Sequence, residues 1–255
     1  MSDNGFSASW LDLREPADHQ ARDKGLLARA AETAPDGSVI LDLGSGTGST
    51  ARAFNGHLPA CTWRFLDGNA DLLDIAAERH PGSEQMIANL SDVEAIPLDN
   101  VGLVTASALF DLMPETWIET LAARLKSERI PLYAALNYDG RMTWDPALPD
   151  DVSITASFNQ HQRTDKGLGP ATGPTSANAI DRIFSKAGFI VHSADSPWTL
   201  DESTIALHDD LLTGIASSAD EMGNPLATGW LESRRQFIAT ASVLVGHTDV
   251  LAIPA

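Results

Sequence analysis

Short apolar stretches alternate with longer amphipathic stretches along most of the chain from Ser38 onward. The short stretches have the length and residue types of buried strands, and the longer ones repeat apolar residues at helical spacing. Regular alternation of strand and helix predicts a parallel sheet with helices on both faces. The predicted strands are 39–43, 62–67, 84–89, 101–107, 130–138, 189–195 and 248–254, and the clearest predicted helices between them are 69–79, 114–127 and 176–188.

The segment before the first predicted strand is a leader. Residues 14–37 predict one helix, because Pro16 suits a first helical turn and Pro35 and Gly37 end the pattern. We therefore divide the chain into a leader, 1–37, and one α/β domain, 38–255.

Two stretches interrupt the alternation in the second half. Residues 139–174 are rich in Pro and Gly and are too long for an ordinary connection, which predicts a functional or mobile segment. Helical patterns at 202–216 and 228–241 predict a helical insertion, about 199–243, before the last strand.

The first predicted strand ends in a glycine-rich turn, ILDLGSGTGST. Such turns let a nucleotide approach the backbone, and they occur in several nucleotide-binding folds. Asp42 lies in the apolar strand just before Gly44, where an ionised carboxylate is costly unless a cation or hydrogen-bond donors meet it. A pyrophosphate would add a second anion, whereas the ammonium and sulfonium of S-adenosylmethionine would relieve the cost. Only Thr47 separates Gly46 from Gly48, one residue fewer than the dinucleotide fingerprint requires.

A second carboxylate, Asp67, closes the next predicted strand about 20 residues after the glycines. At that position it can accept hydrogen bonds from both ribose hydroxyls. NAD and S-adenosylmethionine share this requirement, so Asp67 predicts a ribose without choosing the cofactor.

Three segments in order, VILDLGSGTGST, LDGNADLLDIAAER and MIANLSD, resemble the first three motifs of class I S-adenosylmethionine-dependent methyltransferases. The resemblance covers 38–137 and extends more weakly to 195. It implies a Rossmann-like three-layer sandwich with a seven-stranded, mostly parallel sheet whose last strand, TDVLAIP, is antiparallel. Where the family often has Asp, this chain has Asn89, whose carbonyl still accepts hydrogen bonds.

The resemblance also implies cofactor-binding residues. The methionyl group is expected beside the first motif, the ribose beside the second and the adenine beside the third, with the end of the fourth strand and the arginines of the leader completing the site. The predicted cofactor residues are Asp42, Gly44, Ser45, Gly46, Asp67, Gly68, Asn89, Leu90, Ser107, Arg14 and Arg22.

Sequence motifs identify the residues that bind the methyl acceptor less clearly than those that bind the cofactor. Asp111, His161 and Tyr138 are the candidate catalytic residues, as a base or as groups at strand ends, although a methyltransferase can work by positioning alone. The HQRTDK cluster favours an acceptor that carries a carboxylate or phosphate. An exposed loop with internal ion pairs is the alternative interpretation of that cluster. The predicted substrate residues are Arg163, Lys166, Asn137 and Trp10.

Charge and composition exclude several other classes. With 35 acidic and 17 basic residues the net charge is −18, which disfavours nucleic acid as a partner. The single cysteine, Cys61, fits a reducing compartment, and the sequence has neither a signal-peptide pattern nor an apolar run of about 18 residues. These features predict a cytoplasmic protein without a membrane partner. We expect no bound metal, and we expect a monomer or homodimer.

We therefore expect a methyltransferase that acts on oxygen or nitrogen of a small molecule. Two alternatives remain open at this point. A NAD(P)-dependent oxidoreductase would share the glycine turn and Asp67, and a noncatalytic S-adenosylmethionine-binding regulatory protein would share the whole cofactor site.

Overall fold

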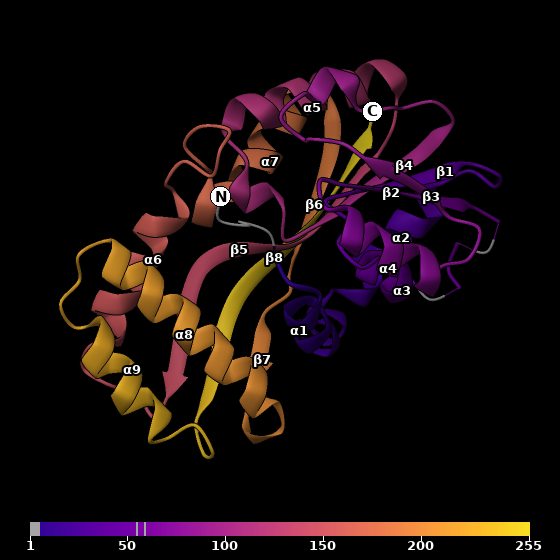
Figure 1. Ribbon diagram of the computed structural model, residues 1–255. Coiled ribbons are helices and arrows are strands. Elements are labelled where there is room, and N and C mark those ends of the chain that lie inside the picture. Colours follow the sequence, from indigo (N-terminus) through magenta and orange to yellow (C-terminus); the bar gives the residue numbers. More distant parts are fainter. Residues whose placement is uncertain (1–5, 55, 59) are drawn as a thin grey trace.

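A computed structural model describes residues 6–54, 56–58 and 60–255. The chain forms an eight-stranded sheet in the order β3-β2-β1-β4-β5-β8-β6, with β7 paired to β8 (Figure 1). The strands are β1 (Val39–Leu43), β2 (Thr62–Asp67), β3 (Glu84–Ile87), β4 (Val101–Ser107), β5 (Leu132–Asp145), β6 (Phe189–Asp195), β7 (Trp198–Leu200) and β8 (Ser242–Pro254).

Strand direction confirms the predicted fold class. β1 to β5 pair in parallel, and β8 runs antiparallel to β5, β6 and β7. The expected number of seven strands was one too few, because the three-residue strand β7 adds an eighth. So short a strand carries no periodicity that distinguishes it from a loop.

Helices cover both faces of the sheet (Figure 1). Along β1, Leu41 and Leu43 pack with α5 and α7, whereas Ile40 packs with α2 and α3, so alternate side chains enter different cores. The helices are α1 (Ala8–Ala21), α2 (Lys24–Thr33), α3 (Ser49–Phe54), α4 (Ala70–Arg79), α5 (Glu115–Glu128), α6 (Asp151–Gln162), α7 (Ser176–Lys186), α8 (Ile205–Glu221) and α9 (Ala227–Arg235).

The leader is two helices, which corrects the expectation of one. The Ser7 side chain accepts a hydrogen bond from the N–H of Trp10, so α1 begins early and Pro16 lies inside it. The Asp23 side chain then caps α2 by accepting from the N–H of Leu26. Its own N–H donates to Asp249 of β8 at 3.1 Å, which fixes the break between the helices.

β5 and β8 run past the main sheet as a two-stranded ribbon, at the lower left of Figure 1. Tyr138 pairs with His247 and Trp144 with Val243, while β7 joins the other edge of β8. We call this part the extension: 138–145, β7, 242–247, α6, α8 and α9. Its helices bury a separate apolar core.

The extension corrects two expectations. The segment 139–174 begins as a continuation of β5 and contains α6, so it is no single long connection. The last predicted strand, 248–254, begins earlier than expected, because β8 starts at Ser242. Alternating apolar residues extend both strands, and the extension buries them on one face only. Helices α8 and α9 lie between β7 and β8, within the stretch expected as an insertion.

None of the helices among the described residues has the length and apolar character needed to cross a bilayer.

Candidate active site

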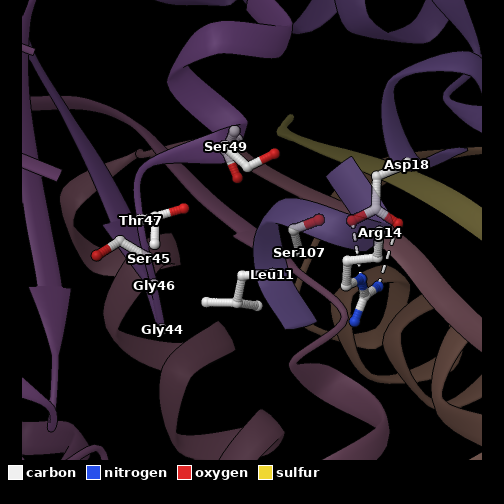
Figure 2. Close-up of a pocket in the computed structure, with 10 residues that line it drawn as sticks. Leu11, Arg14, Asp18, Gly44, Ser45, Gly46, Thr47, Ser49 and Ser107 are labelled. Carbon is white, nitrogen blue, oxygen red and sulfur yellow. Dashed lines mark hydrogen bonds and ion pairs between the residues drawn. The ribbon is translucent and has the colours of Figure 1, made fainter. Parts of the chain in front are cut away.

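The glycine turn after β1 and helix α1 enclose a cavity of about 50 Å³, which we call the glycine-loop cavity (Figure 2). In Figure 2 the Arg14–Asp18 ion pair is drawn with dashed lines, and Leu11 lies between that pair and the glycines. The lining residues are Leu11, Arg14, Asp18, Gly44, Ser45, Gly46, Thr47, Ser49, Thr50 and Ser107.

Position 46 requires a glycine, both for its backbone conformation and for the close approach of Leu11. Its φ is +53°, in the left-handed region that favours glycine, and a Cβ there would lie 2.9 Å from Cδ1 of Leu11. The turn therefore keeps its backbone open to the cavity while α1 passes directly over it.

Asp67 joins the glycine turn to β2. One carboxylate oxygen accepts from the N–H of Gly46 at 2.8 Å, and the other accepts from the N–H of Asn69 at 2.9 Å. The side chain is half-buried, between Gly46 of the glycine-loop cavity and its own neighbour Gly68. Asp67 itself is not among the residues that line the glycine-loop cavity.

Asp42 lies beneath the glycine turn, and it is not one of the residues that line the cavity. It is fully buried and accepts from the Thr105 hydroxyl at 2.7 Å, while Oδ2 has no hydrogen-bond partner among the described residues. Burial raises the pKa of Asp42 to about 7, and the hydrogen bond from Thr105 and the charge of Arg22 oppose that rise.

The two leader arginines have different positions. Arg14 lines the cavity, forms an ion pair with Asp18 at 2.9 Å and lies 5.0 Å from the centroid of the Trp198 ring. Arg22 is buried behind the wall and donates through Nη2 to Oγ of Ser107 at 2.8 Å. Arg14 can therefore meet a ligand directly, whereas Arg22 acts through Ser107.

A larger cavity of about 620 Å³, the strand-end cavity, lies at the ends of β2 and β3. It brings Gly68, Asn89 and Leu90 together, as the sequence predicts for the adenine end of the cofactor. Lys166 lines this cavity too, so part of the HQRTDK cluster lies at the predicted cofactor site. The other lining residues are Ile87, Ala88, Met113, Gly167 and Leu168.

A third cavity of about 170 Å³, the aromatic cavity, lies between α1, the ends of β4 and β5, and the extension. Arg14 lines both this cavity and the glycine-loop cavity, so the two adjoin. The lining residues are Phe6, Trp10, Arg14, Ala108, Asp111, Leu112, Leu136, Tyr138, Met142, Phe158, Gln162, Trp198, Leu211, Val245 and His247.

Three residues of the aromatic cavity carry buried polar atoms that have no partner among the described residues: Nε1 of Trp10, Oδ1 of Asp111 and Nδ1 of His247. Burial raises the pKa of Asp111 to about 6. Burial, with the charge of Arg14, lowers the pKa of His247 to about 4. At neutral pH the carboxyl is therefore largely ionised and the imidazole is neutral.

The backbone is strained at two positions of the aromatic cavity. Ala108 and Leu136 have φ values of +49° and +56°, conformations that cost about 1–3 kcal/mol each in residues other than glycine. The N–H of Leu136 donates to Oδ1 of Asp249 at 2.8 Å, and that of Ala108 donates to the carbonyl of Ala135 at 3.0 Å. Strain held in this way is common at ligand sites. The sequence gives no signal for it.

Several predicted residues lie elsewhere. Nε2 of His161 is 3.1 Å from Oε2 of Glu221, and His161 lines none of the three cavities. Arg163 lines none of them either.

Asn137, a predicted substrate residue, is fully buried. Its side-chain amide donates to the carbonyls of Ala134 and Thr248, so it fixes the irregular pairing of β5 with β8.

Tyr138 and Trp10 do line the aromatic cavity, as their prediction as acceptor-side residues requires. The Tyr138 hydroxyl donates to Oδ1 of Asn159 at 2.7 Å. His247 and Phe158 also line this cavity, although no sequence pattern predicted them there. The alternation of apolar residues on either side of Tyr138 and His247 is the signal that could have found the extension.

No family model and no curated protein sequence matches the chain. Several solved structures do match the fold of the chain. A cyclopropane synthase from Mycobacterium tuberculosis aligns over 97% of this chain and 94% of its own, with a TM-score of 0.54 and 16% identity. A protein from Bacillus halodurans, named as a proposed methyltransferase, aligns over 90% and 99%, with a TM-score of 0.53 and 15% identity.

A geranyl diphosphate methyltransferase, solved in complex with S-adenosylmethionine, aligns over 100% of this chain and 93% of its own, with a TM-score of 0.54 and 12% identity. The chain has the class I methyltransferase fold. At such identities the likeness concerns the fold alone. In this fold ligands bind at the carboxyl ends of the strands, which is where the glycine-loop and strand-end cavities lie.

Proposed function

We propose that the chain is an S-adenosylmethionine-dependent methyltransferase that acts on nitrogen or oxygen of a small molecule. The observation that carries this proposal is the position of Arg14 on the wall between the glycine-loop cavity and the aromatic cavity. A donor group held in the first cavity would face an acceptor held in the second.

The residues present fit the cofactor. Asp67 would receive the ribose hydroxyls, and Asn89 with Leu90 would border the adenine in the strand-end cavity. Arg14 would pair with the methionyl carboxylate beside Gly46, where a Cβ would already collide with Leu11. The orphaned Oγ of Ser45 is a further hydrogen-bonding group at this turn.

When bound, S-adenosylmethionine supplies an electrophilic methyl group on a good leaving group. The protein's own contribution is then to hold the acceptor, exclude water and receive a proton. Most residues that line the aromatic cavity are apolar or aromatic, and with ligands bound they would limit the access of water. Asp111, whose pKa of about 6 lies near neutrality, is the group suited to receive the proton.

Two features disfavour a dinucleotide. Asp18 lines the glycine-loop cavity and Asp42 lies beneath it, so a pyrophosphate there would meet two carboxylates. The adjoining aromatic cavity with its unpartnered polar atoms favours an enzyme over a noncatalytic cofactor-binding protein.

Calorimetry tests the cofactor. We expect S-adenosylmethionine and S-adenosylhomocysteine to bind with micromolar dissociation constants and NADH not to bind. Binding of NADH without either S-adenosyl compound would refute the proposal.

A further inference from the structure

We propose that the acceptor is a small amine that binds as an ammonium ion in the aromatic cavity, with the Asp111 carboxylate as its counter-charge. This inference rests on the proposed function and specifies its substrate class. It names nitrogen as the methylated atom.

The balance of charge around the aromatic cavity favours a cation. Among the lining residues, Arg14 is paired with Asp18 at 2.9 Å and would also meet the methionyl carboxylate of the proposed cofactor, so two anions share its charge. His247 is neutral because burial lowers its pKa. Burial also raises the pKa of the Tyr138 phenol, which stays protonated. Asp111 is therefore the acidic lining residue whose Oδ1 atom has neither a hydrogen bond nor an ion pair among the described residues, although the charges of Arg14 and Lys166 act on it from a distance.

Asp111 is held in place by the backbone around it. It lies in the 3-10 turn Phe110–Leu112. The Thr172 hydroxyl donates to the carbonyl of Phe110 at 2.7 Å, and the N–H of Thr172 donates to the carbonyl of Met113 at 2.9 Å. The flanking backbone is thus tied down on both sides. Oδ1 of Asp111 remains buried without a partner, a cost that an ammonium N–H would remove.

Aromatic rings form part of the wall of this cavity. Tyr138 packs edge-on against Phe158, with ring centroids 5.6 Å apart. His247 lies 6.1 Å from Tyr138 and 5.2 Å from Trp198 by the same measure. Aromatic faces attract cations, and a carboxylate among such faces is a typical receptor for an ammonium group. The volume of about 170 Å³ restricts the site to a small molecule.

The same arrangement disfavours the anionic acceptor suggested by the HQRTDK cluster. Lys166 lines the strand-end cavity, and Arg163 lines none of the three. A carboxylate or phosphate in the aromatic cavity would instead meet the unpaired charge of Asp111.

Asp111 also provides a route for the proton. A protonated amine has no free lone pair. Transfer of one N–H proton to a carboxylate oxygen of Asp111 converts ammonium and carboxylate into amine and carboxylic acid, with no net change in charge. The nitrogen is left with the electron pair that it needs as a nucleophile.

Three ligands of similar shape but different charge test the inference. We suggest 2-phenylethylamine, 2-phenylethanol and phenylacetate as cationic, neutral and anionic probes, measured by calorimetry at pH 8. Each is titrated into the protein alone and into the protein saturated with S-adenosylhomocysteine. The amine is expected to bind at least about tenfold more tightly than the alcohol, and phenylacetate is expected not to bind.

Asp111→Asn is expected to weaken amine binding by about tenfold or more and to change alcohol binding by less than about twofold. Asp74→Asn, at an exposed carboxylate of α4, is the matched control and should change neither. Phe158→Leu should weaken both probes, because it removes an aromatic wall and no charge.

The wild-type protein offers a second measurement that needs no variant. Amine affinity should fall as the pH decreases from 8 to 5, because the Asp111 carboxyl gains a proton, while alcohol affinity should stay constant. Arg14 and Lys166 are the charged groups that act on Asp111, and the neutral His247 and the protonated Tyr138 line the same cavity.

Three results would overturn the inference: equal or tighter binding of the alcohol, tightest binding of phenylacetate, or an amine preference that survives in Asp111→Asn. Binding of S-adenosylhomocysteine is recorded in the same titrations. Its failure would refute the proposed function separately, because amine binding to the protein alone is measured independently.

Discussion

Asp67 accepts a hydrogen bond of 2.8 Å from the backbone N–H of Gly46, which joins the end of β2 to the glycine turn after β1. The same carboxylate is the predicted receiver of the ribose hydroxyls. It therefore shapes the turn and binds the ligand, and the two roles can be separated by substitution.

Asp67→Ala removes both roles. We expect the affinity for S-adenosylhomocysteine to fall by about tenfold to a hundredfold, since each hydrogen bond to a charged group is worth about 1.5–3 kcal/mol. Asp67→Asn keeps one acceptor oxygen and should retain more affinity than the alanine variant. Calorimetry of both variants measures this, and equal affinities for wild type and Asp67→Ala would contradict the assignment.

The contact between Gly46 and Leu11 predicts a rescue. In Gly46→Ala the new Cβ would lie 2.9 Å from Cδ1 of Leu11, in a left-handed backbone conformation. We expect cofactor affinity to decrease at least tenfold, because α1 must shift. Adding Leu11→Ala removes the collision but keeps the backbone strain of about 1–2 kcal/mol, so affinity should recover in part. Additive losses in the double variant would show that α1 does not press on the turn.

The extension depends on a buried ion pair between α6 and α9. Asp151 accepts from Nε of Arg234 at 3.0 Å and from Nε1 of Trp230 at 2.8 Å, and Arg234 also stacks on Trp144. Replacing Arg234 with Met leaves a buried carboxylate unpaired, so we expect the free energy of unfolding to fall by about 3–5 kcal/mol. Urea denaturation measures the loss.

The exposed pair Arg235–Asp209, on α9 and α8, is the matched control for this prediction. Arg235→Met should change stability by less than about 1 kcal/mol. Similar losses in the two variants would contradict the importance of the buried pair.

The burial of Asp42 predicts a pH dependence of stability. Its pKa is raised to about 7 in the folded chain, against about 3.9 when unfolded, so the folded state binds the extra proton between these values. The ligand-free wild type should therefore lose stability relative to Asp42→Asn as the pH rises from about 4 to 7, by about 1–4 kcal/mol, with little further change above 7. Denaturation of both proteins across this range measures the difference, and a difference that rises with pH would contradict the assignment.

The sequence predicted four strands in full and missed the outer halves of two others. β1, β2, β4 and β6 match the predicted strands, because strands such as β1 that are buried on both faces appear as unbroken apolar runs. The outer halves of β5 and β8 were missed, because the extension buries alternate residues and Pro and Gly dominate the pattern nearby. Pro16 misled the placement of α1, since the capping by Ser7 outweighs it.

In the candidate site, too, the sequence predicted the residues that belong to local motifs and missed those that only the fold brings together. Gly44, Gly46, Gly68, Asn89 and Leu90 come from local motifs, and the structure places them on the two cavities assigned to the cofactor. The aromatic cavity joins residues from opposite ends of the chain, such as Trp10 and His247, through the antiparallel pairing of β8. No local sequence pattern predicts that these distant residues lie together. Asp111 was therefore predicted as a candidate catalytic residue, but the cavity around it was not.

Transfer of a labelled methyl group tests the central claim most directly. The protein is incubated with trideuteromethyl S-adenosylmethionine and the small-molecule fraction of a cell extract, and the products are followed by mass spectrometry. We predict a small amine that carries the labelled methyl group, formed by the wild type and strongly reduced in Asp67→Ala. Cofactor that binds without any transfer of label to a small molecule would contradict the claim.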